Sequence, residues 1–143
     1  MLSRTAQYAL RAMTYLARQP AERRVGVREI ARRTGVPAQY LARILRDAVR
    51  AKLLESARGV GGGFCLARPA KRIRLREVLA PFDDVVARCA CPFGQASCGD
   101  GDACGIHPHW KPVKRAYLRM LERTTLAEVA VIGLPERCLV VGR

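Results

Sequence analysis

The sequence predicts a mainly α-helical protein: a winged helix–turn–helix unit with a small two-stranded wing, then a cysteine loop and a long dimerisation helix. Three observations lead to this fold class. Apolar residues recur at spacings of three and four over residues 3–19 and 28–50. The glycine-rich stretch RGVGGG separates two short strand-like runs. A cysteine-rich stretch without apolar periodicity precedes a last helical segment.

The chain divides into four segments by these patterns. Residues 1–84 form the predicted winged helix–turn–helix unit, and residues 85–109 form the cysteine-rich loop. Residues 110–132 form the dimerisation helix and a short capping helix, and residues 133–143 are a tail with no assignment. A length of 143 residues suits one compact domain, or a small domain with an appendage.

The cysteine content and the N-terminus indicate a cytoplasmic protein. No apolar run approaches the length of a membrane span, and the first 20 residues are periodic and contain arginines, unlike a signal peptide. Thiols stay reduced in the cytoplasm. The six cysteines therefore favour metal binding or redox chemistry over a disulfide framework.

The charge lies entirely in the first half of the chain. Residues 1–76 contain 18 lysines and arginines against four acidic residues, and they therefore carry the whole formal charge of +14. Residues 77–143 contain eight of each sign. This asymmetry is typical of a nucleic-acid-binding half joined to a neutral half.

The basic half begins with a helix predicted from about Ser3 to Gln19, with Ser3 as its N-cap. A second, short helix runs from Arg28 to Thr34 and ends at Gly35. Pro37 then opens a third helix, because proline is favoured in a first helical turn. The two short helices joined by this turn have helix–turn–helix form.

The third helix is amphipathic and separates an apolar face from a basic row. Its buried face is predicted to hold Leu41, Ile44, Leu45 and Ala48. The opposite row has side chains that can reach base edges and phosphates in a major groove, although an ordinary solvated arginine face would have the same pattern. The charge asymmetry favours DNA binding, for which the candidate residues are Arg28, Gln39, Tyr40, Arg43, Arg46, Arg50 and Arg58.

The wing is predicted from two strands, Leu53–Ala57 and Phe64–Leu66, joined by the glycine-rich hairpin. Arg58 lies at its tip, where it can contact a phosphate or the minor groove. A nucleotide-binding loop is excluded, because Phe64 stands where the last glycine of that motif is needed and no helix follows. Cys65 is interpreted as a small buried hydrophobe.

The candidate metal ligands follow the pattern Cys91-x6-Cys98-x5-Cys104-x2-His107. Structural zinc sites usually pair cysteines two to four residues apart, so these gaps fit zinc poorly. An irregular glycine-rich loop can instead wrap an iron–sulfur cluster, at which histidine can replace cysteine. The alternative interpretation is a set of cysteines that hold no metal.

The segments LSRTAQYALRAMTYLA, VREIARRTGVPAQYLARIL and RGVGGGF resemble the Rrf2 family of winged-helix regulators, typified by IscR and NsrR, through at least residues 1–126. The resemblance implies an iron–sulfur cluster, 2Fe–2S in preference to 4Fe–4S. IscR-like members use three cysteines and the histidine of a C-x2-H pattern, here Cys104 to His107. NsrR-like members use an acid from the partner's first helix. Gln7 occupies the matching position here, and a neutral amide is a poor iron ligand.

Two positions compete with this ligand set. Cys89 also resembles the family's first ligand position, but its gap of eight residues to Cys98 favours Cys91. His109 is second choice to His107, because the C-x2-H spacing selects the latter. Cys138 has no partner in the sequence and is interpreted as structural or incidental.

The last helices predict self-association. The long helix has an apolar stripe on one face, and too little chain remains to cover it. We therefore expect a second copy of the chain to cover this stripe. Thr125 and Glu128 form a capping box that starts a short final helix. The predicted dimer-interface residues are Trp110, Val113, Tyr117 and Leu121.

The combined expectation is a homodimeric transcription regulator that binds a double-stranded DNA operator under the control of an iron–sulfur cluster with three cysteine ligands and one histidine ligand. RNA polymerase is a further candidate partner, and no membrane is expected. The first alternative is a cluster-free regulator of the same fold that uses Cys91, Cys98 or Cys104 as a thiol switch, or binds a partner protein. An enzyme or electron carrier is disfavoured, because no base–nucleophile pair is evident.

Overall fold

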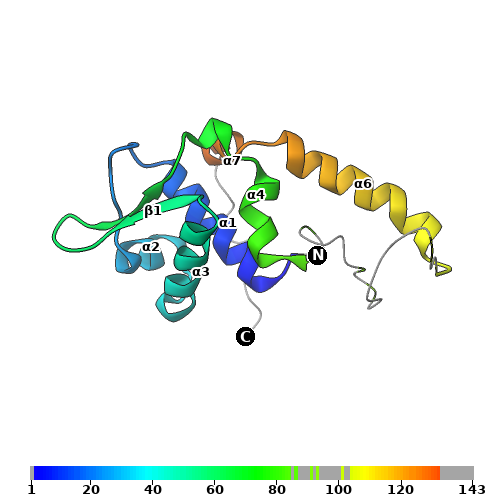
Figure 1. Ribbon diagram of the computed structural model, residues 1–143, viewed down its shortest axis with the longest axis horizontal. Coiled ribbons are helices and arrows are strands. Elements are labelled where there is room, and N and C mark those ends of the chain that lie inside the picture. The colour runs from blue at the N-terminus through cyan, green and yellow to red at the C-terminus, as the bar shows by residue number, and fades with distance from the viewer. Residues whose placement is uncertain are drawn as a thin grey trace.

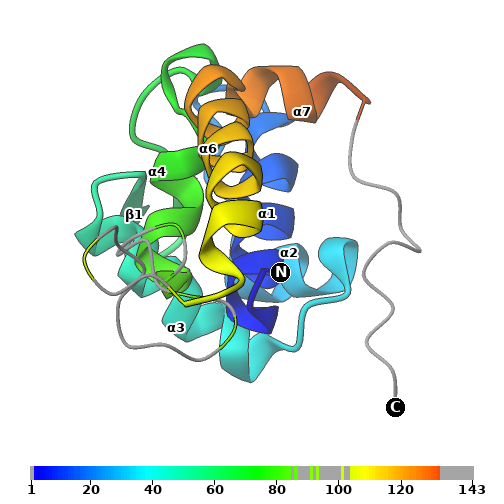
Figure 2. The same ribbon diagram turned by 90° about the vertical axis from the view of Figure 1, so that its right-hand side faces the viewer.

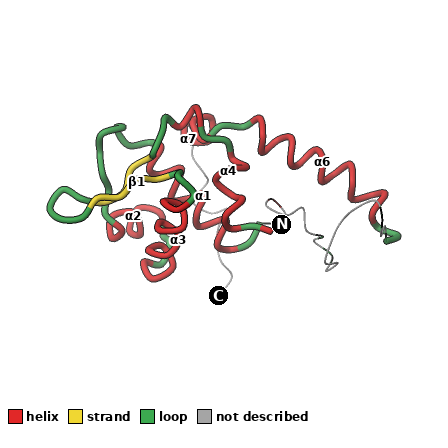
Figure 3. The backbone as a smooth tube through the Cα atoms, viewed as in Figure 1, coloured by secondary structure: helices red, strands yellow, loops and turns green. Residues whose placement is uncertain are grey.

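The computed structural model describes residues 2–84, 86, 91, 93, 101 and 104–132. Helices surround a single apolar core, and a two-stranded hairpin projects from one end (Figures 1 and 3). None of the described helices is long and apolar enough to cross a membrane. The elements are α1 (Arg4–Ala17), α2 (Val27–Thr34), α3 (Ala38–Arg50), β1 (Leu54–Ala57), β2 (Gly63–Leu66), η1 (Ala70–Arg72), α4 (Leu75–Leu79), η2 (Ala80–Phe82), α6 (His107–Arg123) and α7 (Leu126–Ile132).

The helix ends are set by local capping, as the sequence predicts. The Ser3 hydroxyl accepts a hydrogen bond from the Ala6 N–H at the start of α1. Gly35 ends α2 with a φ of 70°, in the left-handed region that glycine adopts without steric cost. At α7, Thr125 and Glu128 form a reciprocal capping box, and the hydrogen bonds from Thr125 lower the pKa of the Glu128 carboxyl.

The core lies between α1 and the helices around it. α1 packs against α2, α3, α4 and α7, and it therefore forms the centre of the fold. α7 follows the long helix but returns to pack on α1, with Leu126 fully buried (Figure 2). This helix thus completes the core of the winged-helix unit, although the cysteine-rich segment and α6 separate the two in sequence. The largest fully buried side chains include Met13, Ile30, Leu41, Leu45, Leu53, Ile73, Leu79 and Leu126.

The wing is a β1–β2 antiparallel hairpin with Leu54 opposite Leu66 and Ala57 opposite Gly63. It contains one pairing that local patterns do not predict: Val25, before α2, forms a bridge to Phe64 with N···O distances of 2.9 Å in both directions. The hairpin is therefore attached to the segment that leads into the helix–turn–helix. Cys65 is buried in β2, as expected.

Gly63 is the residue that makes this attachment fit. Its φ is +132°, and an added Cβ would lie 2.6 Å from the Val25 carbonyl atoms. We expect Gly63→Ala to lower the free energy of unfolding by about 2–3 kcal/mol and Tm by roughly 5–10 °C in a thermal melt. Gly26→Ala is the control, because no atom lies within 4 Å of its added Cβ; it should cost under about 1 kcal/mol. Equal losses in the two variants would contradict this account.

Candidate functional site

The exposed face of α3 presents the predicted basic row. Leu41, Ile44, Leu45 and Ala48 are buried as expected, and packing of this face against the core turns the opposite face outward. The side chains of Arg43 and Arg50 are 83% and 81% exposed. Gln39 and Arg46 are exposed on the same helix, and so are Arg28 on α2 and Arg58 at the start of the wing loop.

Asp47 lies within the basic row and was not identified from the sequence. Its carboxylate lies 3.9 Å from Arg43 Nε and 3.4 Å from Arg50 Nη1, at the i,i+4 and i,i+3 spacings of one helix face. Exposed ion pairs of this kind stabilise by about 0–1 kcal/mol. Asp47 therefore orients the two arginine side chains, and breaking these ion pairs costs little free energy.

Tyr40 is the aromatic member of this surface. It is 56% exposed, and its ring lies 6.4 Å from the Tyr8 ring of α1, tilted by 38°. The contact positions the first turn of α3 against the N-terminal half of α1. The wing, α2 and α3 occupy one end of the molecule, whereas α6 extends from the opposite end (Figure 1).

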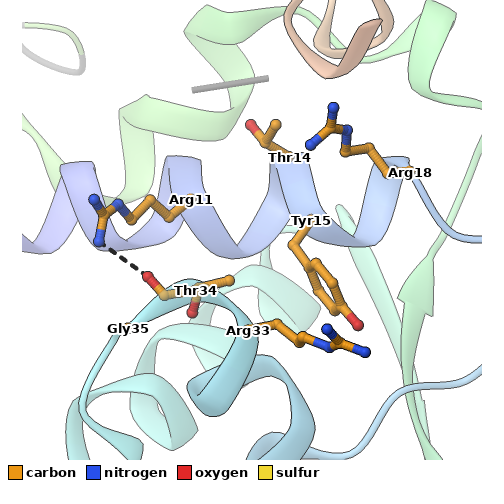
Figure 4. Close-up of a pocket in the computed structure, with 7 residues that line it drawn as sticks. All are labelled: Arg11, Thr14, Tyr15, Arg18, Arg33, Thr34 and Gly35. Carbon is orange, nitrogen blue, oxygen red and sulfur yellow. Dashed lines mark hydrogen bonds between the residues drawn. The ribbon is translucent and has the colours of Figure 1, made fainter. Parts of the chain in front are cut away.

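A second basic surface lies between α1 and the end of α2, where a groove of about 310 Å³ is lined by Arg11, Arg18 and Arg33. The three guanidinium groups point in different directions, and Arg11 donates a hydrogen bond of 2.9 Å to the Thr34 carbonyl (Figure 4). The Tyr15 hydroxyl at the groove donates to Glu29, and burial together with this bond raises the pKa of Tyr15. The groove adds to the positive surface without forming a convergent site for one anion.

The structure describes candidate ligands from both ends of the cysteine loop. Cys91 and Cys104 are partly buried, and Cys98 lies outside the described residues, as do Cys89 and Cys138. His107 is 8% exposed and is the first residue of α6, so it belongs to the helix and not to the preceding loop. The backbone N–H of His107 donates a hydrogen bond of 2.9 Å to the Cys104 carbonyl. The C-x2-H segment therefore forms the turn that begins α6.

An aromatic contact brings the two ends of the loop together. The Phe93 ring packs edge-on against Trp110 at a centroid distance of 5.8 Å. Phe93 follows Cys91 by two residues, and Trp110 follows His107 by one helical turn. The segments that carry the first and last candidate ligands therefore meet at the start of α6.

The donor set fits a thiolate-held cluster. Among the residues that the structure describes, which include Cys91, Cys104 and His107 but not Cys98, no three potential metal ligands are grouped closely enough to hold a metal ion. Thiolate and imidazole are the ligands that iron–sulfur centres use. His107 is buried whereas His109 is exposed, and Gln7 Nε2 donates to the Leu2 carbonyl of its own chain. Within the described part of the chain, two further buried atoms of α6, Trp110 Nε1 and Tyr117 Oη, have no hydrogen-bond partner.

The predicted apolar stripe of α6 is divided by the fold. Two of the predicted interface residues are already covered within the protomer: Leu121 is 2% exposed within the core, and Trp110 is buried beside Phe93. Tyr117 also packs against the core. Val113 alone of the four is exposed. It lies between Ile106 and Met120 at seven-residue spacing, and these three residues form the outward apolar strip.

Asp83 joins three parts of the molecule. Its buried carboxylate accepts the Ser3 N–H at 2.9 Å and the Val86 N–H at 3.3 Å. The Ser3 hydroxyl also donates to the Phe82 carbonyl at 2.7 Å. On α6, burial and then the negative charge of Asp83 raise the pKa of Tyr117. The start of α1 and the start of the cysteine loop therefore meet at one carboxylate, whose charge also acts on Tyr117 of α6.

A cavity is lined by residues of α1, α3 and the η2 segment. It has a volume of about 910 Å³ and is lined by Tyr40, Arg43 and Asp47 of α3 and by Phe82–Asp84 on the other side. Arg4 and Tyr8 of α1 belong to the same lining. Residues of α3 and of the segment that leads into the cysteine loop thus border one cavity.

Comparison with known proteins identifies the family. The family model Rrf2, described as an iron-dependent transcriptional regulator, matches residues 2–131. A Mycobacterium tuberculosis protein named as an HTH-type transcriptional regulator is 34% identical over 94% of this chain and 84% of its own length. The HTH-type transcriptional regulator IscR of Xenorhabdus nematophila is 31% identical over 90% of this chain and 77% of that protein.

Two solved structures have the same fold. CymR, the global cysteine regulator of B. subtilis, is 21% identical with a TM-score of 0.76 over 94% of this chain and 98% of its own. IscR of T. potens is 26% identical with a TM-score of 0.70 over 92% and 87%. Both support the winged-helix fold with its two-stranded wing. The chain belongs to the Rrf2 family of transcriptional regulators.

Proposed function

We propose that the protein is a homodimer that binds operator DNA through α3 and the wing, and that an iron–sulfur cluster held by Cys91, Cys98, Cys104 and His107 controls this binding. The observation that carries the proposal is the contact of Phe93 with Trp110, which brings the Cys91 segment to the Cys104–His107 turn. The relatives named IscR support the same assignment.

In this proposal, the basic row of α3 contacts the DNA bases. Gln39, Arg43, Arg46 and Arg50 are exposed side chains on one helix face, and they suit base edges and phosphates in a major groove. Arg58 and Arg28 extend the positive surface to the wing and α2. Binding dominated by such contacts weakens with salt, with a slope of about −0.9 in log K per phosphate neutralised.

The outward strip of α6 is the proposed dimer face. Ile106, Val113 and Met120 are 41%, 51% and 46% exposed at a strict seven-residue spacing. α6 extends away from the rest of the protomer, so the strip is available to a second copy (Figures 1 and 2). A two-fold pair of recognition helices then matches a palindromic operator.

The burial of His107 supports the set of three cysteines and one histidine over its competitors. His107 is 8% exposed, and its position at the start of α6 fixes its backbone. When bound, the cluster supplies a centre that can change charge or be lost under oxidation. The protein's own residues orient the ligands, because Phe93 and Trp110 hold the two loop ends together.

Asp83 provides a route from the loop to DNA. A change in the loop that moves Val86 alters the Asp83 carboxylate, and the hydrogen bond to Ser3 passes that change to α1. α1 contacts α3 through Tyr8 and Tyr40. The recognition helix can therefore respond to the loop without direct contact between the cluster and DNA.

The test compares the protein with and without its cluster. Anaerobic isolation should give a visible absorption spectrum with iron and acid-labile sulfide, and footprinting should show different operator occupancy for the holo and apo proteins. A colourless protein whose operator binding responds only to thiol oxidants would instead establish the thiol-switch regulator, for which the partly buried Cys91 and Cys104 are the candidates.

Arg43 is expected to contribute sequence choice as well as affinity. Arg43→Ala should weaken operator binding by about 1–3 kcal/mol if it contacts a guanine bidentately, and weaken binding to random DNA less. The charge-matched control is Arg119→Ala on α6, outside the basic half, which should change both affinities little. Equal losses on operator and random DNA for Arg43→Ala would show a phosphate contact only.

A further inference from the structure

The inward face of α6 contains an unexplained hydrogen-bond donor. His107, Trp110, Lys114 and Tyr117 follow one another at spacings of three, four and three, and they therefore share one face of the helix. The Trp110 Nε1–H is buried and has no hydrogen-bond partner among the residues that the structure describes. An indole nitrogen can only donate, and a buried donor without an acceptor costs stability. The structure thus indicates that an acceptor belongs beside Trp110.

The position of the indole limits what that acceptor can be. On one side it contacts Phe93, two residues after Cys91. On its own helix Trp110 lies one turn after His107, and the backbone N–H of His107 donates a hydrogen bond to the Cys104 carbonyl. Trp110 therefore lies where the two ligand-bearing segments meet. In the proposed cluster-bound protein, these segments would supply cysteine thiolates, and the cluster would supply inorganic sulfide.

We infer that the Trp110 Nε1–H donates a hydrogen bond to an anionic sulfur of the iron–sulfur cluster, either a ligating thiolate or a bridging sulfide. The inference rests on the proposed cluster function. A hydrogen bond to such a sulfur stabilises the reduced, more negative cluster, and it therefore raises the reduction potential. Trp110 would accordingly set the potential at which the regulator changes state.

The experiment exploits the fact that Trp110 is the single tryptophan of the chain. Growth with β-(3-benzothienyl)alanine in place of tryptophan replaces the indole only here; it keeps the ring shape and removes the N–H. Trp110→Phe is the genetic counterpart. Tyr117→Phe is the control, because it removes another unpartnered buried donor from the same helix face two turns further on.

Two readouts test the hydrogen bond directly. Anaerobic redox titration of the visible absorbance should give a more negative midpoint potential for both Trp110 replacements than for the wild type, with Tyr117→Phe unchanged. Resonance Raman spectra of the Fe–S stretches should shift between H2O and D2O in the wild type. The part of this shift due to the indole N–H should disappear in both Trp110 replacements.

The outcomes separate the inference from the function on which it rests. A wild-type protein that holds no cluster after anaerobic isolation defeats the proposed function. A wild-type cluster whose potential and deuterium shift are the same in the benzothienyl protein overturns the Trp110 inference alone. If Trp110→Phe fails to fold, the benzothienyl protein still decides the question, because its side chain has nearly the same shape as the indole.

Discussion

Replacement of Val113 and Met120 by glutamate is expected to convert the proposed dimer into monomers. Both side chains lie on the outward strip of α6, about half exposed in the protomer, and pairing would bury like charges across a two-fold axis. The protomer should remain folded, because neither residue belongs to the core. Sedimentation velocity measures the change in mass, and circular dichroism checks that helix content is kept.

Loss of the dimer should also have a large effect on DNA binding. Two linked half-site contacts bind more tightly than one by about 10²–10⁴-fold, so the monomer should lose roughly that factor in operator affinity. The control is Arg115→Gln with Arg119→Gln, which changes the net charge by the same amount on other, exposed positions of α6. A glutamate double variant that sediments as a dimer would place the interface elsewhere.

Substitution of Leu121, one of the interface residues predicted from the sequence, would give a misleading test. Leu121 is buried in the core of its own protomer, so Leu121→Glu would unfold the chain whatever the oligomeric state. Substitutions in the outward apolar strip, in contrast, test assembly without disrupting the core.

If the proposed cluster is present, Cys104→Ala is expected to abolish it. The thiolate cannot be replaced by a methyl group, and the remaining candidate ligands cannot complete the coordination. Iron content and visible absorbance after anaerobic isolation should both fall close to the background of metal-free protein. His107→Ala should give a labile or spectrally altered cluster, because water or a weaker donor takes the place of the imidazole.

Two nearby residues are matched controls for this ligand set. His109→Ala removes an exposed imidazole two residues further along α6, and Cys89→Ala removes the competing thiol; both should keep the wild-type spectrum. A cluster that requires Cys89 and tolerates His107→Ala would contradict the assignment of His107 as the fourth ligand and indicate an all-thiolate site.

The sequence by itself determined the features that depend on residues close together in the chain. Ser3, Gly35 and the Thr125–Glu128 pair mark helix ends, because capping bonds span at most a few residues. The periodicity of α3 likewise fixed which arginines are exposed, since the apolar face had to be buried. The fold class and the family resemblance followed from these local patterns, and the family match confirmed them.

Only the tertiary structure decided the features that depend on distant neighbours. The Val25–Phe64 bridge, the bonds from Ser3 to Asp83 and Phe82, and the contact of Phe93 with Trp110 join segments that local periodicity treats separately. The same reason explains the division of the α6 stripe. The sequence of a helix shows which of its residues are apolar. Which of them face the core and which face solvent depends on where α4 packs against α6, and this is set by contacts far apart in the chain.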